Sequence, residues 1–143
     1  MSNDLRRIRI NVDNALQYLH GMNEGDLASA MRGFSDDVVY RGIERRGDAI
    51  YRRLYQGKSE VQRYIGAWLK TASGVKYEVL SVKQFGDGVF IHWTDSTTGE
   101  GGQYANEGIL VFEFNEEGLV NHARPYSAAG PIAHLDFLGA GQT

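Results

Sequence analysis

The chain has 143 residues, an apolar fraction of 42% and a formal net charge of −3, which fits one globular domain spanning residues 1–143. It has no cysteine, which excludes disulfides and thiol nucleophiles. No basic stripe, no apolar run near the ~20 residues of a membrane helix and no signal peptide is present, so we expect a cytoplasmic protein that binds neither nucleic acid nor membranes.

Helical patterns dominate the first half of the chain. Apolar residues recur at spacings of three and four from Leu5 to Met22, which predicts an amphipathic helix. Asp26 is placed to cap a second, short helix that runs through Met31. A turn at residues 36–37 and a short strand at residues 38–40 are expected to follow.

Residues 43–57 fit either a helical turn or two capped by Asp48 or an ordered loop. The next helix has the strongest pattern. Ser59 and Gln62 form an S-x-x-Q capping box, and Gly74 is expected to end the helix. Its buried stripe is predicted to contain Val61, Tyr64, Ile65, Trp68, Leu69 and Ala72.

The rest of the chain reads as strands. Two strands, 75–85 and 89–95, flank a hairpin turn at residues 86–88. A glycine-rich loop at 97–102 leads to a long strand, 103–115, in which Gly108 is expected to mark a bulge or a sharp bend. After a turn, the last strand runs from Leu119 to Ser127, and the tail, 128–143, is expected to fold back as a short apolar cover with a mobile end.

Helices followed by an antiparallel meander predict an α+β domain. We expect a cone-shaped α+β barrel, with the N-terminal helices packed in the concave face of a strongly bent, mostly antiparallel sheet. The sheet is expected to close over the helix that begins at Ser59, and the open end of the cone would be a pocket.

The stretch GVFIHWTD, residues 88–95, raises the main functional question. Val89, Ile91, Trp93 and Asp95 alternate, so a strand would point all four side chains the same way. Asp95 then either lies in an apolar pocket beside Trp93, where a carboxyl group fits a general base, or starts the polar loop DSTTGEGG.

The segments GDLASAMRGFSDDVVYRG, GKSEVQRYIGAWL and EGILVFEFNEEGLVNHARPY resemble the nuclear transport factor 2-like superfamily. That superfamily includes the SnoaL-like polyketide cyclases, ketosteroid isomerase and limonene epoxide hydrolase. The resemblance covers nearly the whole chain as an order of elements. It implies a hydrophobic pocket and a homodimer, and it is specific for architecture more than for activity.

The resemblance to the isomerases assigns three positions. Tyr18 matches a tyrosine of the first helix, seven residues before the Gly-Asp pair at 25–26. The isomerase general base falls at Gly42 and the second acid at Leu110. Neither carboxylate is present here, which leaves steroid isomerisation without a group to move the proton.

The resemblance to the epoxide hydrolases assigns further positions of the sequence. Tyr40 matches a water-holding tyrosine, and Trp93-Thr94-Asp95 replaces their Arg-x-Asp. Their third carboxylate, and an acid of the polyketide cyclases, fall near Pro125. The match implies that Tyr40, Trp93 and Asp95 line one cavity.

Several other side chains allow two interpretations. Tyr18 and Tyr40 either donate hydrogen bonds to a substrate oxygen or are core aromatics. Asn106 shares a strand face with Tyr104 and Leu110, and either binds backbone or points at a ligand, which we favour slightly. His122, Arg124 and Tyr126 share a face of the last strand, and we favour the outward register, with Ala123 and Pro125 toward the cavity, over an inward acid/base and anion-binding role.

Phe90 and His92 should lie on the outer face of the sheet, where exposed aromatics suggest a homodimer interface. No metal-ligand spacing is present. The arginines from Arg41 to Arg53 would suit a phosphate or coenzyme A, but the acids among them favour a solvated loop.

The sequence thus predicts a small enzyme without cofactor or metal that acts on a compact, mostly apolar molecule by acid/base chemistry: cyclisation, isomerisation, dehydration or epoxide opening. The alternatives are a non-catalytic binder of small molecules or an interaction domain with a filled cone. The predicted catalytic residues are Asp95, Tyr40 and Tyr18, and the predicted substrate-binding residues are Trp93, Trp68, Asn106, Leu110 and Tyr104.

Overall fold

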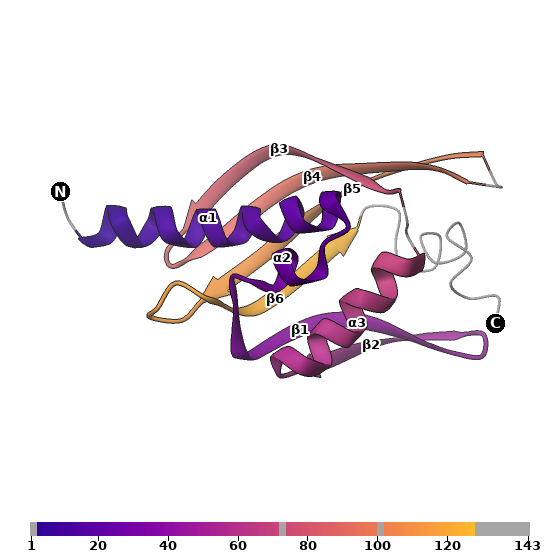
Figure 1. The fold of residues 1–143 in the computed structure, drawn as a ribbon, viewed down its shortest axis with the longest axis horizontal. Helices are drawn as coiled ribbons and strands as arrows, with labels where there is room; N and C mark the ends of the chain where they lie inside the picture. The colour runs from indigo at the N-terminus through magenta and orange to yellow at the C-terminus, as the bar shows by residue number, and fades with distance from the viewer. Residues whose placement is uncertain (1–2, 72–73, 100–101, 128–143) are drawn as a thin grey trace.

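A computed structural model of the chain describes residues 3–71, 74–99 and 102–127 (Figure 1). The expectations for Ala72 and for the tail, 128–143, lie outside the described residues. The elements in chain order are α1 (Asn3–Glu24), α2 (Leu27–Met31), β1 (Phe34–Arg46), β2 (Ala49–Gln56), α3 (Lys58–Thr71), β3 (Lys76–Phe85), β4 (Gly88–Gly99), β5 (Gly102–Phe114) and β6 (Val120–Ser127).

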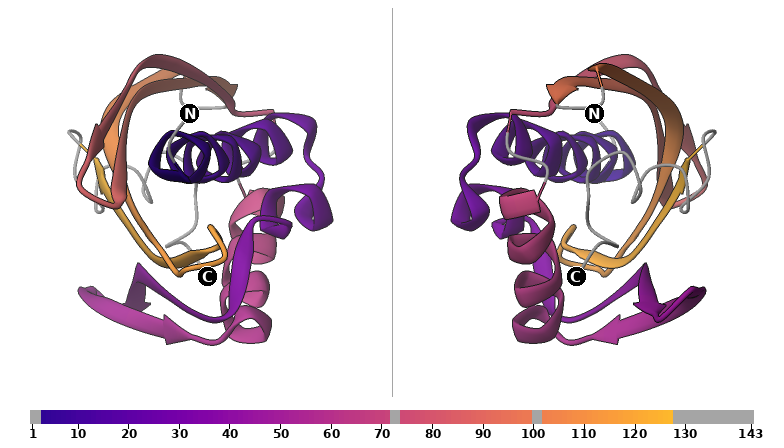
Figure 2. Two further views of the ribbon diagram at one scale, coloured as in Figure 1. Left: turned by 90° about the vertical axis from the view of Figure 1, so that its left-hand side faces the viewer. Right: turned by 90° about the vertical axis from the view of Figure 1, so that its right-hand side faces the viewer.

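The described strands form one six-stranded sheet in the order β2-β1-β6-β5-β4-β3. All neighbours pair antiparallel except β1 and β6, which are parallel. The sheet is strongly curved but not closed, so the fold is a cone-shaped α+β fold, as predicted, without a complete barrel. Seen along α1, the sheet curls around this helix (Figure 2).

The position of the helices corrects one expectation. The curl of β3 to β6 surrounds α1, whereas α3 packs chiefly against β1 and β2. The helix enclosed by the cone is therefore the first one and not the helix that contains Ser59. The amphipathic stripe of α1 explains this, because its buried residues include Ala15, Tyr18, Leu19 and Met22.

Of the two helix caps predicted from the sequence, the one at α2 is found and the one at α3 is not. Asp26 caps α2 as predicted, and its Oδ1 accepts a hydrogen bond from Ser29 N at 3.1 Å. The capping box at Ser59 is wrong, since α3 already begins at Lys58. The Gly57 carbonyl accepts the first helical bond, from Val61 N, and Glu60 reaches back to Gln56 N.

The segment from Phe34 to Gln56 differs most from expectation. No turn occurs at residues 36–37, and residues 43–56 form neither a helical turn nor a loop. β1 continues to Arg46 and pairs with β2 across a turn that contains Gly47, which has a φ of +60°. Long charged side chains on this hairpin obscure the alternation of apolar and polar residues that is typical of strands. The paired residues Tyr40 and Tyr55 are nevertheless both buried.

Two glycine-based expectations in the second half, a loop at residues 97–99 and a bulge at Gly108, are also wrong. Residues 97–99 are not a loop, because β4 and β5 stay paired as far as Gly99 and Gly102. No bulge occurs at Gly108 in this pairing, since the register runs unbroken from Val89 opposite Phe112 to that end. The predicted hairpin at 86–88 and the turn before β6 are present.

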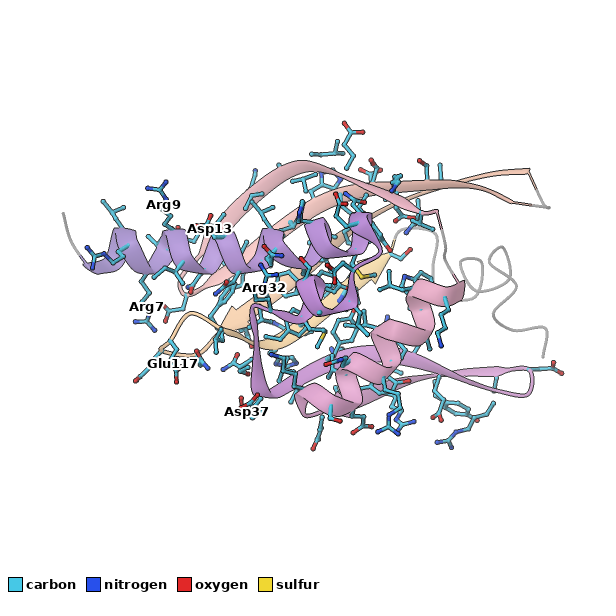
Figure 3. The ribbon with its side chains drawn as sticks, viewed as in Figure 1. Arg7, Arg9, Asp13, Arg32, Asp37 and Glu117 are labelled. Carbon is cyan, nitrogen blue, oxygen red and sulfur yellow. The ribbon has the colours of Figure 1, made fainter. Side chains whose placement is uncertain are left out.

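The core lies between α1, α2, α3 and the concave face of the sheet. Its largest fully buried side chains are Phe34, Phe112, Met31, Ile65, Ile91, Val38, Val61, Val89 and Val120. Charged side chains such as Arg9, Asp13 and Glu117 are exposed (Figure 3). Within the described ranges, no helix has both the length and the apolar character needed to cross a membrane.

Candidate functional site

A cavity of about 180 Å³ lies where α1 and α3 meet the concave face of the sheet. Seven of its eighteen lining residues are aromatic and five others are charged or polar. A mainly apolar wall with a few polar groups is typical of small-molecule sites. Its lining consists of Tyr18, Leu19, Tyr40, Arg41, Gly42, Ile43, Arg52, Tyr64, Ile65, Trp68, Tyr77, Trp93, Asp95, Asn106, Leu110, Pro125, Tyr126 and Ser127.

Asp95 lies in this lining and is only 2% exposed. The alternation of β4 places it on the same buried face as Val89, Ile91 and Trp93, as the sequence predicts. Its Oδ2 accepts hydrogen bonds from Trp93 Nε1 at 2.6 Å and from Asn106 Nδ2 at 3.3 Å. Its Oδ1 is buried and has no hydrogen-bond partner in the described part of the chain.

Asn106 and Ser127 fix the orientation of Asp95. Asn106 stands directly opposite Asp95 on β5, so its amide reaches the carboxylate across the strands. Ser127, at the end of β6, donates a hydrogen bond from Oγ to Asn106 Oδ1 at 2.8 Å. Asn106 therefore lies in the cavity wall, as predicted, but these hydrogen bonds go to protein groups. Ser127 was missed, because its role depends on the pairing of β5 with β6.

Tyr18 of α1 and Tyr40 of β1 lie together in the wall. Their hydroxyl oxygens are 3.3 Å apart, so one donates to the other. Burial raises the pKa of Tyr18 to about 12, although the hydrogen bond to Tyr40 opposes the shift. Burial also raises the pKa of Tyr40 well above its ordinary value, helped by the nearby tyrosines. Both phenols stay protonated at neutral pH and can act as hydrogen-bond donors.

Three further aromatic side chains complete the wall. Trp68 of α3 donates from Nε1 to the Tyr77 hydroxyl at 3.2 Å. Both backbone groups of Tyr77 are bound by the Asn23 side chain, which ties β3 to the end of α1. Tyr64 accepts a hydrogen bond from Ile43 N, and burial raises its pKa. Trp68 was expected here, whereas Tyr64 was predicted only as a core residue and Tyr77 had no sequence signal beyond strand propensity.

The positions where the resemblance expects further carboxylates all line the cavity: Gly42, Leu110 and Pro125. At Gly42 the space for a side chain is already occupied. A Cβ there would lie 2.7 Å from Tyr55 Cε2 and 2.8 Å from Tyr64 Cζ. Among the described lining residues, Asp95 is the one acidic side chain.

The outward register favoured for β6 is found. Ala123 is buried, Pro125 lines the cavity, and His122 and Arg124 both contact Glu113 on the outer face, at 3.3 and 3.2 Å. Tyr126 is 40% exposed and reaches the edge of the cavity.

Other predicted positions have mixed outcomes. On β4, Phe90 and His92 also face outward, as predicted, and the homodimer through this face stays a prediction. The side chain of Tyr104 lies outside the described residues. No cluster of potential metal ligands occurs among the described residues.

A curved sheet with a helix in its concave face and a cavity at one end defines a protein of the nuclear transport factor 2-like class. Residues 15–123 match the SnoaL-like domain family. The chain belongs to this family. A comparison with curated protein sequences gives no match.

Solved structures share the fold at low sequence identity. TerC, co-crystallised with polyporic acid, superposes with a TM-score of 0.74 at 14% identity, covering 91% of this chain and 98% of TerC. An NTF2-like protein from Anabaena variabilis gives 0.73 at 13% identity, with 91% and 95% covered. AclR, a putative hydroxylase from Streptomyces galilaeus, gives 0.64 at 18% identity, with 90% and 84% covered. These likenesses establish the fold alone.

Proposed function

We propose that this protein is a small acid/base enzyme that acts on a compact, mostly apolar molecule in the cavity, with Asp95 as the group that moves the proton. The observation that carries the proposal is the asymmetry of the Asp95 carboxyl group. Two donors hold Oδ2, whereas Oδ1 is buried without a partner in the described chain. Buried polar atoms are almost always paired, so Oδ1 is the oxygen left to accept a hydrogen bond or a proton from a bound molecule.

The fixed orientation of Asp95 suits proton transfer. A general base must be held within hydrogen-bond reach of the proton that it removes. Trp93 and Asn106 restrain the carboxyl group through the oxygen that would not react, and Ser127 restrains Asn106 in turn. A group that is already oriented does not have to be ordered again during the reaction.

The pair of Tyr18 and Tyr40 supplies the complementary role. Two neutral phenols carry two protons, and their mutual hydrogen bond uses one of them. The second proton is free to be donated to an oxygen of the bound molecule. Proton removal next to a carbonyl builds negative charge on that oxygen, and a positioned donor stabilises it.

The size of the cavity limits the bound molecule. A volume of about 180 Å³ is close to the ~150 Å³ cavity that holds benzene in another protein. One ring with a short substituent fits such a space. TerC, which shares the fold, was co-crystallised with polyporic acid, and this supports a ring-containing organic ligand for this chain as well.

A probe reaction tests the role of Asp95 directly. Nitrobenzisoxazole loses its carbon-bound proton to a carboxylate base, and the N–O bond then breaks to give a coloured cyanonitrophenolate. We expect the wild-type protein to accelerate this ring opening and Asp95→Asn to slow it at least about 100-fold. Asp13→Asn is the matched control, because Asp13 is exposed on α1, and it should keep the wild-type rate.

The competing function is a non-catalytic binder, which the absence of a second acid in the described lining favours. Both tryptophans of the chain, Trp68 and Trp93, line the cavity, so tryptophan fluorescence reports binding there. Binding of the probe without acceleration would establish the binder. Equal rates for wild type and Asp95→Asn would remove Asp95 as the base.

A further inference from the structure

Residues of β1, β2 and β6 line one part of the cavity, and we place its opening there. The two strands pair in parallel only as far as Tyr40 and Ala123, and beyond that point the β1–β2 hairpin diverges from β6 (Figure 1). Residues from both sides of this opening line the cavity, and its exposed lining residues are Arg52 and Tyr126. A ligand would therefore enter past the hairpin.

Two arginines of the hairpin belong to this opening. Arg41 of β1 is half-buried and Arg52 of β2 is exposed, and both line the cavity. Arg41 stands opposite Leu54, two residues from Arg52, so the two arginines are diagonal neighbours on one face of the hairpin. Such neighbours have Cα atoms about 7–8 Å apart or less, which lets two long side chains reach one small group.

No described side chain balances the charges of these two arginines. The other described arginine side chains of the hairpin are paired: Arg46 with Glu44 at 3.0 Å, and Arg53 with Glu44 at 3.3 Å and Glu60 at 2.9 Å. Within residues 3–71, 74–99 and 102–127, neither Arg41 nor Arg52 has an ion pair or a side-chain hydrogen bond. Two neighbouring cations without an anion repel each other.

We propose that Arg41 and Arg52 bind the carboxylate of the ligand, so that the molecule taken by this cavity is a compact ring compound with an acidic side arm. This inference rests on the proposed function for the identity of the cavity. The ring would occupy the apolar wall near Trp68 and Trp93, and the carboxylate would stay at the opening. A planar guanidinium matches a carboxylate in a bidentate geometry.

The charge distribution also sets the orientation of the ligand. Asp95 lies at the buried end of the cavity and disfavours an anion there, whereas the arginines stand at the solvent end. A ligand carboxylate is thus directed to the opening, and its ring carbon atoms to the acid. The sequence left these arginines as part of a solvated loop, because the fold alone brings Arg41 and Arg52 together at the cavity.

The test compares phenylpropionate with its uncharged amide, phenylpropionamide, which has nearly the same shape. Dissociation constants are measured by calorimetry and by tryptophan fluorescence. We expect wild type to bind the acid about five- to tenfold more tightly than the amide, since the contact is charge-assisted but partly solvated. The preference should shrink as salt is added.

Variants assign the preference to the two arginines. Arg52→Gln, an exposed change that leaves the core untouched, and the double variant Arg41→Gln/Arg52→Gln should lose the preference while binding the amide as wild type does. Arg46→Gln, on the same hairpin but paired with Glu44, is the matched control and should keep it.

The outcomes separate this inference from the proposed function. Equal affinity of wild type for acid and amide, no binding of the acid, or an unchanged preference in the double variant would overturn the arginine site. Asp95→Asn should keep the preference or increase it, because it leaves both arginines in place and removes a negative charge that disfavours the anion. Loss of probe turnover in Asp95→Asn with an intact acid preference therefore supports both proposals. An acid preference in a wild-type protein that shows no probe turnover would support the arginine site and contradict the proposed enzyme.

Discussion

Gly108 of β5 lies directly opposite Trp93 of β4, and the space of its missing side chain is filled by the indole ring. A Cβ at position 108 would lie 2.4 Å from Trp93 Cη2 and 2.4 Å from the Tyr126 carbonyl oxygen. The glycine therefore allows Trp93 to lie across the strand, from where its Nε1 reaches Asp95 Oδ2. The orientation of the candidate base depends on a residue with no functional group.

Gly108→Ala should consequently lower the stability of the fold and change the orientation of the Asp95 carboxylate. We expect the free energy of unfolding to fall by about 1–3 kcal/mol, because an added methyl group in a packed site forces neighbours to move. The displaced indole should also change the tryptophan emission and slow the probe reaction. Urea unfolding and fluorescence measure these effects.

Gly66→Ala provides the control for this change. Gly66 lies in α3, and a Cβ there would meet only the end of the flexible Leu27 side chain, at 3.1 Å. Alanine is the better helix former, so stability should stay equal or rise by up to about 1 kcal/mol. If both alanine variants have the same free energy of unfolding, the close packing of Trp93 on Gly108 does not contribute to stability.

The behaviour of β4 and β5 shows which parts of the site are readable from sequence. The shared face of Trp93 and Asp95 follows from the period of a strand, which is a local property, and it is confirmed. The contact of Asp95 with Asn106 requires the register between two strands, which no local pattern encodes. Gly108 was expected to mark a bulge or a sharp bend, because a glycine inside a strand gives the same signal for a bulge and for a close approach.

The β1–β2 hairpin shows a different limit. Exposed strands with many arginines lack a clear apolar alternation, so residues 43–56 gave no strand signal. The resemblance to known families nevertheless assigned Gly42, Leu110 and Pro125 to the cavity, and all three line it. The cavity positions were therefore transferable from the families. The placement of Arg41 and Arg52 at the cavity instead follows from the pairing of β1 with β2 and from the position of this hairpin beside β6.

Restoring a carboxylate at the isomerase position should fail in this chain. Gly42→Asp places a side chain where the rings of Tyr55 and Tyr64 already lie, 2.7 and 2.8 Å from the new Cβ. We expect a loss of about 1–3 kcal/mol or more in the free energy of unfolding, with no new turnover of the probe. Chemical unfolding together with the probe assay checks this, and a stable, faster variant would show that the position still accepts a base.

Tyr18 should make the protein sensitive to alkaline pH. Below pH 10 the native and unfolded states both keep the phenolic proton, so Tyr18 adds no pH dependence. Above its ordinary pKa of 10.0 the unfolded state loses the proton first, while the native state holds it until about pH 12. Stability should therefore fall as pH rises between these values, by roughly 2–3 kcal/mol from this residue.

Comparing Tyr18→Phe with wild type in urea unfolding across this range isolates that contribution. The variant should lose stability less steeply with pH, since it has no proton to lose at this position. Tyr51→Phe, a change at an exposed side chain of β2, should follow the wild-type slope. Parallel slopes for wild type and Tyr18→Phe would contradict the burial of a neutral phenol at this position.

Ser127 is expected to position Asp95 through its hydrogen bond to Asn106. Ser127→Ala removes the hydrogen bond from Oγ to Asn106 Oδ1 and so weakens the restraint on the amide that donates to the carboxylate. Because the proton-accepting geometry would loosen while the apolar wall stays intact, the probe reaction should show a lower kcat, by a few-fold, with little change in KM. Ser127→Thr keeps the hydroxyl and should recover most of the rate. If Ser127 has a purely structural role, Ser127→Ala should lower the stability of the native fold and of the probe complex and leave kcat per folded molecule unchanged. Ser127→Thr would then give no recovery of the rate.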